Sequence, residues 1–255
     1  MLVFHFYSSN SQEGVTQSMT KSFELILFDL DDTLLYFEDY WEQGTKEAFR
    51  QFPITESLNA DRLFETYQEY SAYYVEKYHQ QEISIQQFRN NRFIRTLNDW
   101  GVNVDEAAAH RFNELYHEVS TRFMIAAPEL SPLLDMLQRS YKLGIVTNGT
   151  REVQFDKLKA LGIESYFPQG GVIISDDIGW EKPDPRIYEA ALSFFAAQPE
   201  TTLFVGDSWK NDVVGPGSLG IASIWLNKKG EPAKQHPTLF ATIERLDELG
   251  EKLTS

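Results

Sequence analysis

The 255-residue chain contains no cysteine. This absence excludes disulfide bonds, a thiolate nucleophile and a zinc site built on cysteine. Long apolar runs are also missing: no stretch could span a bilayer, and the apolar residues 1–7 are too few for the core of a signal peptide. We therefore expect a cytoplasmic protein with no membrane partner. Residues 1–20 are predicted to be an N-terminal extension, with Met19 as an alternative start.

Basic residues are scarce as well. The chain has 23 Lys and Arg against 38 Asp and Glu, which gives a net charge of −15 and a pI near 4.7. A nucleic acid polymer or an anionic membrane attracts a basic surface, so neither is an expected partner. A small anionic substrate remains compatible with this charge if a metal ion or a local lysine reverses the field at the site.

Glycine is absent from 45–100 and proline from 54–127, while apolar and aromatic residues recur there at helical spacing. This pattern predicts a helical bundle. We place its helices at 38–51, 59–79, 84–100 and 105–123.

After residue 128, short apolar runs alternate with helical stretches and glycine-rich turns. Alternation of this kind is typical of right-handed βαβ units that build a parallel sheet. The predicted strands are 143–147, 171–174, 203–205 and 221–225. The predicted helices are 131–139, 151–161, 185–196 and 211–219.

An earlier apolar run, 25–28, has the composition of a strand buried on both faces. The helix that should connect it to the next parallel strand comes only after the bundle. We therefore predict an α/β fold: a Rossmann-like parallel-sheet core with an inserted all-α helical-bundle cap. The predicted bounds are 21–36 and 126–255 for the core and 37–125 for the cap.

Carboxylates follow the first strand directly, as Asp29 and Asp31. In an extended chain, side chains two residues apart point the same way and lie about 7 Å apart, so these two can face one pocket. Ligands bind at the carboxyl ends of parallel strands, which makes the pair a candidate for chemistry. Taken alone, a turn or a helix cap is an equally good interpretation.

Polar residues also stand at or between the ends of later strands. Thr147 and Asn148 precede a glycine and could hold an anion, although a simple turn is favoured for them in isolation. Asp207 follows another strand, and Asp212 by itself would be a helix N-cap. Lys182 lies in a loop and by default would be a surface lysine. Because these residues all lie at or between the ends of predicted strands, together they indicate a functional site.

If these loops converge, Asp29, Asp31, Asp207 and Asp212 share one pocket. Two unit charges about 4 Å apart repel by roughly 4 kcal/mol near a protein surface, so such a cluster requires a cation. Because the available ligands are all oxygens, they favour Mg²⁺, which commonly shares its coordination shell with phosphate. The site therefore indicates phosphoryl transfer on a small phosphorylated metabolite.

These motifs, in this order, resemble the four motifs of the haloacid dehalogenase (HAD) superfamily; they are 29–33, 147–149, 182–185, and 206–207 with Asp212. A helical insertion after the first motif resembles the first cap type of that superfamily. Within it, 29–41 and the tyrosine-rich cap most resemble the bacterial branch of pyrimidine 5′-nucleotidases.

The resemblance implies roles for the first motif. Asp29 would be the nucleophile that forms an aspartyl-phosphate, and Asp31 would first protonate the leaving oxygen and then activate water. The dehalogenase branch needs no metal and does not carry Asp two residues after the nucleophile, where this chain has Asp31. The chain therefore resembles a phosphatase. Asp32 is predicted to be a turn residue and Thr33 a hydrogen-bonding brace.

The resemblance also implies the roles of the later motifs. Thr147 and Asn148 would bind phosphate, and Lys182 would neutralise the nucleophile and the phosphoryl oxygens. Asp207 would bind Mg²⁺ together with Asp29 and the backbone carbonyl of Asp31. Asp212 would support the metal shell through water or through Lys182.

The predicted function is therefore that of a Mg²⁺-dependent phosphatase for a small phosphomonoester, with a nucleoside 5′-monophosphate as first candidate. A sugar phosphate or another metabolite is the alternative. A phosphonate hydrolase would need a reactive cap lysine, for which Lys46 and Lys77 are available. A non-catalytic phosphate-binding module is the remaining hypothesis.

Substrate choice should depend on the cap. Tyr36, Phe37 and Trp41 follow the first motif and are expected to line the substrate entrance. One face of a predicted helix carries arginines that could meet the substrate, although a solvated face is favoured; they are Arg89, Arg92 and Arg95. Tyrosines at helical spacing could stack on a base, although packing inside the bundle is favoured; they are Tyr67, Tyr70, Tyr74 and Tyr78.

Overall fold

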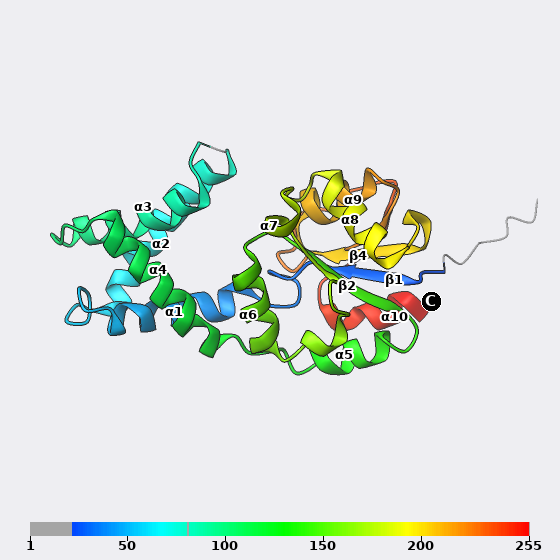
Figure 1. Cartoon of the computed structure of the whole chain (residues 1–255), viewed down its shortest axis with the longest axis horizontal. Coiled ribbons are helices and arrows are strands. Elements are labelled where there is room, and N and C mark those ends of the chain that lie inside the picture. The colour runs from blue at the N-terminus through cyan, green and yellow to red at the C-terminus, as the bar shows by residue number, and fades with distance from the viewer. Residues whose placement is uncertain (1–21, 81, 255) are drawn as a thin grey trace, which may run out of the picture.

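A computed structural model describes residues 22–80 and 82–254, so the predicted extension 1–20 lies outside the described residues. Within them, six parallel strands form one sheet in the order β3-β2-β1-β4-β5-β6 (Figure 1). The strands are β1 (Leu25–Phe28), β2 (Lys142–Thr147), β3 (Val172–Ile174), β4 (Thr202–Gly206), β5 (Ala222–Leu226) and β6 (Leu239–Ile243). Because β1 lies inside the sheet, the residues after it open onto the middle of the carboxyl edge.

Helices cover both faces of this sheet (Figure 1). The core helices are α5 (Leu130–Leu137), α6 (Arg151–Leu161), α7 (Ser175–Ile178), α8 (Pro185–Phe195), α9 (Gly215–Gly217) and α10 (Leu249–Thr254). Ile26 and Phe28 belong to the apolar cluster that includes α5, α6 and α10, whereas Leu25 and Leu27 pack with α8. All four side chains are fully buried, which confirms that β1 is covered on both faces.

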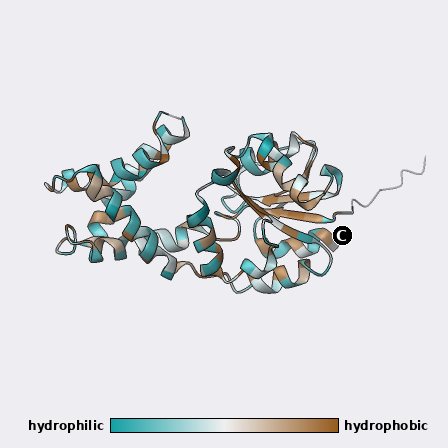
Figure 2. Ribbon diagram, viewed as in Figure 1, coloured by the Kyte–Doolittle hydropathy of each residue, from teal (hydrophilic) through white to brown (hydrophobic). Residues whose placement is uncertain are grey.

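Four helices form the cap between β1 and β2, beside the carboxyl end of the sheet (Figure 1). They are α1 (Phe37–Gln51), α2 (Ala60–His79), α3 (Ile85–Asp99) and α4 (Glu106–Ser120). The cap has its own aromatic core, in which Phe112 stacks on Phe93 with ring centroids 4.1 Å apart and on Phe49 at 4.9 Å. Figure 2 shows the strands as the most continuous apolar segments and the cap helices as largely hydrophilic on their visible faces.

Most predicted elements agree with the structure. Each cap helix begins and ends within three residues of its predicted bounds, and α6 spans the predicted 151–161. Tyr67 is buried in the cap core, as packing predicts, whereas Tyr70 is only half-buried and its hydroxyl donates to Asp99 over 2.6 Å.

The helix predicted over 211–219 is present but begins two residues earlier and is irregular. A π-helical segment (Trp209–Val214) is followed by the short turn α9. Two glycines and a proline in α9 explain why a regular helix does not continue, since these residues are the poorest helix formers.

Three elements of the core, β6, α7 and α10, were not predicted from the sequence. β6 is an edge strand in which two of the five residues are exposed and Thr242 interrupts the apolar residues, so its pattern differs from that of the inner strands. Among the described helices, none combines the length and the apolar character that a membrane crossing requires.

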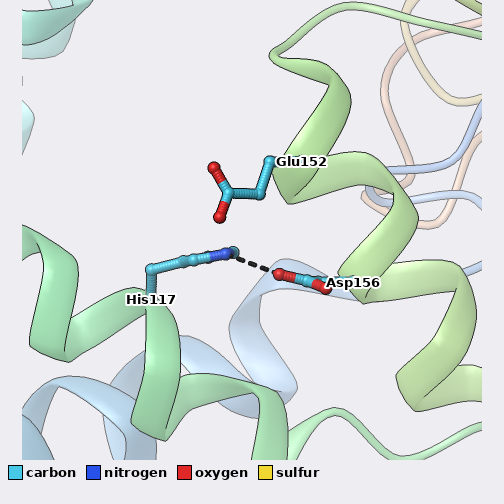
Figure 3. Close-up of side chains that lie close together, drawn as sticks. All are labelled: His117, Glu152 and Asp156. Carbon is cyan, nitrogen blue, oxygen red and sulfur yellow. Dashed lines mark hydrogen bonds and ion pairs between the residues drawn. The ribbon is translucent and has the colours of Figure 1, made fainter.

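The cap contacts the core where α4 approaches α6. His117 on α4 lies 2.9 Å (Nε2 to Oδ2) from Asp156 on α6, and Glu152 projects toward the same point from one turn earlier (Figure 3). Potential ligand atoms of these three side chains all lie within 4.8 Å of one another. This polar contact joins the two parts of the molecule beside the cleft described below.

Candidate active site

The first carboxylate after β1 belongs to a buried charge cluster. Asp29 is only 7% exposed, and its Oδ1 accepts a hydrogen bond from Lys182 Nζ over 2.7 Å. The same ammonium group donates to Asp212 Oδ1 over 2.8 Å, and Asp212 is completely buried. Lys182, which the resemblance associates with the nucleophile, is therefore a buried link between two carboxylates and not the surface lysine that a loop position alone would suggest.

Asp207, after β4, completes this cluster. Single carboxylate oxygens of Asp29, Asp207 and Asp212 all lie within 4.8 Å of one another. Burial is the main reason that the pKa of Asp29 is raised to about 8, with Lys182 lowering it and Asp212 raising it further. Burial, with repulsion from Asp212, raises the pKa of Asp207 to about 7.

The raised pKa values of Asp29 and Asp207 indicate whether the cluster could hold a cation. In the absence of a cation, burial favours the neutral forms of both carboxyl groups, as is expected for acids grouped away from water. Burial lowers the pKa of Lys182, but attraction to Asp212 and Asp29 outweighs it and the net shift is upward. One ammonium group does not balance three carboxylates. The all-oxygen donor set fits Mg²⁺, which prefers carboxylates and water.

Close packing of the β4 loop holds Asp212 in place. The backbone N–H of Ser208 donates to Asp212 Oδ2 over 2.8 Å. A Cβ atom on Gly206 would collide with the Asp212 carboxylate, so glycine is needed at the end of β4.

The loop after β1 turns sharply between its carboxylates. Asp32 adopts φ = 58°, and its Oδ1 accepts from the backbone N–H of Phe37 over 3.0 Å. This geometry confirms Asp32 as a turn residue. Thr33 is fully buried, and its hydroxyl lies 3.5 Å from Asp29 Oδ2, at the long limit of a hydrogen bond.

Asp31 has a partner that the sequence analysis missed. Lys157 Nζ on α6 donates to both of its carboxylate oxygens, over 2.6 Å and 2.7 Å. Gln154, one turn earlier, approaches Asp31 Oδ2 at 3.4 Å and donates to the backbone carbonyl of Asn148 over 2.9 Å. The only signal in the sequence was the spacing of Gln154 and Lys157 on one face of the predicted helix.

The residues after β2 are placed beside the lysine loop. Thr147 is buried, with its hydroxyl 3.4 Å from the carbonyl of Asn148. The Asn148 side chain donates to the Lys182 carbonyl over 3.1 Å and accepts from the Lys182 N–H over 2.7 Å. The Asn148 amide thus fixes the position of the lysine backbone.

Two clefts open at the turn after β1. The larger, of about 560 Å³, extends from Asp31 and Lys157 into the cap, where its aromatic walls are Phe37, Tyr40, Trp41, Phe88 and Tyr116. The smaller, of about 370 Å³, is lined by Asp32, Tyr36 and Asp207. Of the three residues predicted at the entrance, Phe37 and Trp41 stack at 5.3 Å on the larger cleft, and Tyr36 lines the smaller one.

The chain matches one protein family over most of its length. A model of the family described as haloacid dehalogenase-like hydrolase matches residues 26–226. The pyrimidine 5′-nucleotidase PynA of Streptococcus pneumoniae is 30% identical over 213 residues, which cover 80% of this chain and 84% of that protein.

Another relative, the glyceraldehyde 3-phosphate phosphatase of Methanothermobacter thermautotrophicus, is 35% identical over 115 residues. The match covers 45% of this chain and 50% of that protein, so the chain matches about half the length of this relative. Among solved structures, the HAD-hydrolase YfnB of Bacillus subtilis bound to magnesium has a TM-score of 0.77 at 23% identity, with 92% of this chain and 100% of that chain covered. The fold is thus shared over nearly the whole chain.

Proposed function

Because the chain belongs to the haloacid dehalogenase-like hydrolase family, we propose that it is a Mg²⁺-dependent phosphatase that hydrolyses a small phosphomonoester through an aspartyl-phosphate on Asp29. The observation that carries this proposal is the cluster of Asp29, Asp207 and Asp212 around Lys182. Carboxylates grouped with a buried lysine at the edge of a parallel sheet suit a dianionic phosphoryl group only together with a cation.

In the first step, a carboxylate oxygen of Asp29 attacks phosphorus and the bond between phosphorus and the ester oxygen breaks. Lys182 offsets the charge that repels the carboxylate from the phosphate. Asp31 donates a proton to the leaving oxygen. It then accepts a proton from the water that attacks the aspartyl-phosphate, which releases inorganic phosphate and restores both carboxyl groups.

Lys157 adds a condition to this cycle. Both oxygens of Asp31 accept hydrogen bonds from the Lys157 ammonium group, so neither carries a proton for the leaving oxygen while this contact lasts. Asp31 must first give up the contact and take a proton from water or from the phosphate group of the substrate; it then passes that proton to the leaving oxygen. The phosphoryl group supplies a competing anion for Lys157 as the substrate enters.

Magnesium would be held by Asp29, Asp207, Asp212 and the backbone carbonyl of Asp31, and when bound it supplies positive charge that stabilises the phosphoryl oxygens. We assign phosphate binding to Thr147 and Lys182. We also keep Asn148 as a phosphate-binding residue through its backbone N–H, while its side-chain amide positions the lysine loop. We also assign residues 37–125 to the cap and 21–36 with 126–255 to the core.

A nucleoside 5′-monophosphate is the first substrate candidate, supported by the aromatic walls of the larger cleft and by the similarity to PynA. A sugar phosphate is the alternative, supported by the relative named for glyceraldehyde 3-phosphate. Phosphonate hydrolysis is disfavoured, because hydrogen bonds to Asp61 and Glu42 raise the pKa of Lys46, and a hydrogen bond to Glu82 raises that of Lys77. A lysine that forms a Schiff base needs the opposite shift.

The test is phosphate release from a panel of nucleotides and sugar phosphates, with Mg²⁺ and with a chelator. Turnover should require Mg²⁺, and Asp29→Asn should lower kcat by about a thousandfold or more. Metal-independent turnover, or an Asp29→Asn variant with full activity, would contradict the mechanism. Complete inactivity toward every ester would instead favour the non-catalytic binding module.

A further inference from the structure

The arginines of α3 do not form the solvated face that was favoured from the sequence. Arg92 is only 6% exposed, Arg89 is half-buried one turn earlier, and Arg95 is exposed. Arg89 and Arg92 both line the larger cleft. Two guanidinium groups therefore face the space that begins at Asp31.

The buried guanidinium is held by rings rather than by an acid. Arg92 lies 4.7 Å from the ring centroid of Tyr67 and 4.6 Å from that of Phe88. Such contacts fix the plane of the group but leave its N–H edge available. Among residues 22–80 and 82–254, neither Arg89 nor Arg92 forms an ion pair, and Arg92 Nε is buried without a hydrogen-bond partner.

An unpaired, buried guanidinium is costly, because a charge leaves water without gaining a counter-ion. The cost is unusual in a chain with a net charge of −15, where carboxylates are abundant. Burial and repulsion from Arg92 lower the pKa of Arg89. The unpaired guanidinium of Arg92 and the neighbouring charge of Arg89 together indicate that this part of the cap binds an anionic ligand.

The larger cleft extends from Asp31 at the proposed active site to Arg89 and Arg92 in the cap. Tyr116 lies on the same wall, and its pKa is raised by burial and shifted by Arg92, Arg89 and Asp31. Tyr116 is thus within electrostatic range of both ends. A substrate with its phosphoryl group near Asp29 and its leaving oxygen near Asp31 would extend toward the arginines.

We propose that Arg89 and Arg92 bind a second anionic group, a carboxylate or a phosphate, on the leaving part of the substrate. This inference rests on the proposed phosphatase function and narrows its substrates. Among nucleotides it selects those with an acidic base or a second phosphate. Among sugar phosphates it selects phosphorylated acids and bisphosphates. The planar donor edge of arginine binds both kinds of anion through paired hydrogen bonds.

The experiment compares substrates that differ in one charge. Orotidine 5′-monophosphate and uridine 3′,5′-bisphosphate are each compared with uridine 5′-monophosphate, which separates the carboxylate from the phosphate. A second pair, 3-phosphoglycerate and glycerol 3-phosphate, covers short substrates. kcat/KM is measured for the wild-type protein, Arg89→Gln, Arg92→Gln and the control Arg95→Gln, whose guanidinium lies on the exposed side of the same helix.

In the wild type, at least one substrate with a second anionic group should exceed its counterpart without that group by about tenfold or more in kcat/KM. Arg89→Gln and Arg92→Gln should remove this preference, mainly through KM, and Arg95→Gln should retain it. Hydrolysis of p-nitrophenyl phosphate, which has no second anion, should stay within about twofold of wild type in Arg95→Gln and should remain measurable and Asp29-dependent in both cleft variants. Hydrolysis of p-nitrophenyl phosphate also shows that a variant is folded. If Arg92→Gln does not hydrolyse it, the anion preference of Arg89→Gln alone tests the proposal.

Equal kcat/KM within every wild-type pair would overturn the proposal, as would a preference that survives in both cleft variants. Failure of the proposed function itself is recognised separately. In that case p-nitrophenyl phosphate would not be hydrolysed, or Asp29→Asn would not affect its hydrolysis. The absence of an anion preference in the wild-type protein, with intact Asp29-dependent turnover, would therefore reject only the role of the arginines.

Discussion

At the carboxyl end of β1, three carboxylates surround one ammonium group, whereas in the cap two guanidinium groups line the cleft without an ion pair among the described residues. The first region has excess negative charge in a buried place, and the second has excess positive charge. Each imbalance is unfavourable for the empty protein. We propose that a cation completes the first region and that an anionic group of the substrate completes the second, so that the substrate extends between them.

The largest expected effect is at the centre of the carboxylate cluster. Lys182→Met should lower kcat by about a thousandfold and destabilise the fold by about 3–5 kcal/mol, because it leaves Asp29 and Asp212 buried without their shared partner. Steady-state kinetics with p-nitrophenyl phosphate and thermal unfolding measure both effects. The control is Lys210→Met, which removes an exposed lysine close in sequence. If Lys182→Met behaves like the control, the cluster does not depend on this ammonium group.

The next effect is at the contact between α6 and Asp31. Lys157→Met should lower kcat by about 10- to 100-fold on alkyl phosphates, since Asp31 loses the group that orients it. p-Nitrophenyl phosphate should be affected much less, because its leaving group needs little protonation. Lys159→Met removes an exposed lysine of the same helix and should be neutral. Equal losses on both substrate types would indicate a structural defect rather than impaired proton transfer.

Magnesium should stabilise the protein more as the pH rises. In the metal-free protein the pKa of Asp29 is about 8 and that of Asp207 about 7, against 3.8 for an ordinary Asp. Between about pH 4 and 8 the folded state therefore holds more protons than the unfolded state, and its stability falls as pH increases. Mg²⁺ displaces these protons. At a hundredfold excess over Kd, Mg²⁺ adds about 2.7 kcal/mol to the free energy of unfolding. The affinity for Mg²⁺ rises with pH, because its ligands must be deprotonated.

The measurement is thermal unfolding with Mg²⁺ or with a chelator at pH 5.5 and pH 8, two values chosen to bracket most of this window. Asp207→Asn serves as the matched variant, since it keeps the shape of the side chain and removes a titrating ligand. It should reduce both the metal effect and the pH slope. An identical Mg²⁺ effect at the two pH values would show that these carboxylates do not compete for protons and metal.

The two regions also differ in how far the sequence could predict them. Asp29 and Asp31 follow a buried strand, and Asp207 follows its neighbour in the sheet, so strand ends alone indicate that these carboxylates converge. Lys182 could be associated with them only by its order in the motifs. The cap helices were predictable because their apolar spacing is local to each helix.

Other features depend on contacts between distant segments. Lys157 lies in the middle of a helix, where lysine is usually solvated, and only the approach of α6 to the β1 loop gives it a partner. The burial of Arg92 likewise requires α2, because the ring of Tyr67 covers it. The strand β6 was missed because Thr242 interrupts its apolar residues and two of its five residues are exposed.

The smallest expected effect concerns the contact that joins cap and core beside the cleft. His117→Gln should lower kcat/KM about two- to fivefold, because the bond to Asp156 is partly exposed and such bonds contribute up to about 1 kcal/mol. The expected cause is a weaker attachment of the cap to the core beside the cleft, so the loss should be larger for substrates that reach the arginines than for p-nitrophenyl phosphate. His110→Gln, on the exposed side of α4, is the control. A uniform loss on all substrates would show that His117 acts on the core rather than on the position of the cap.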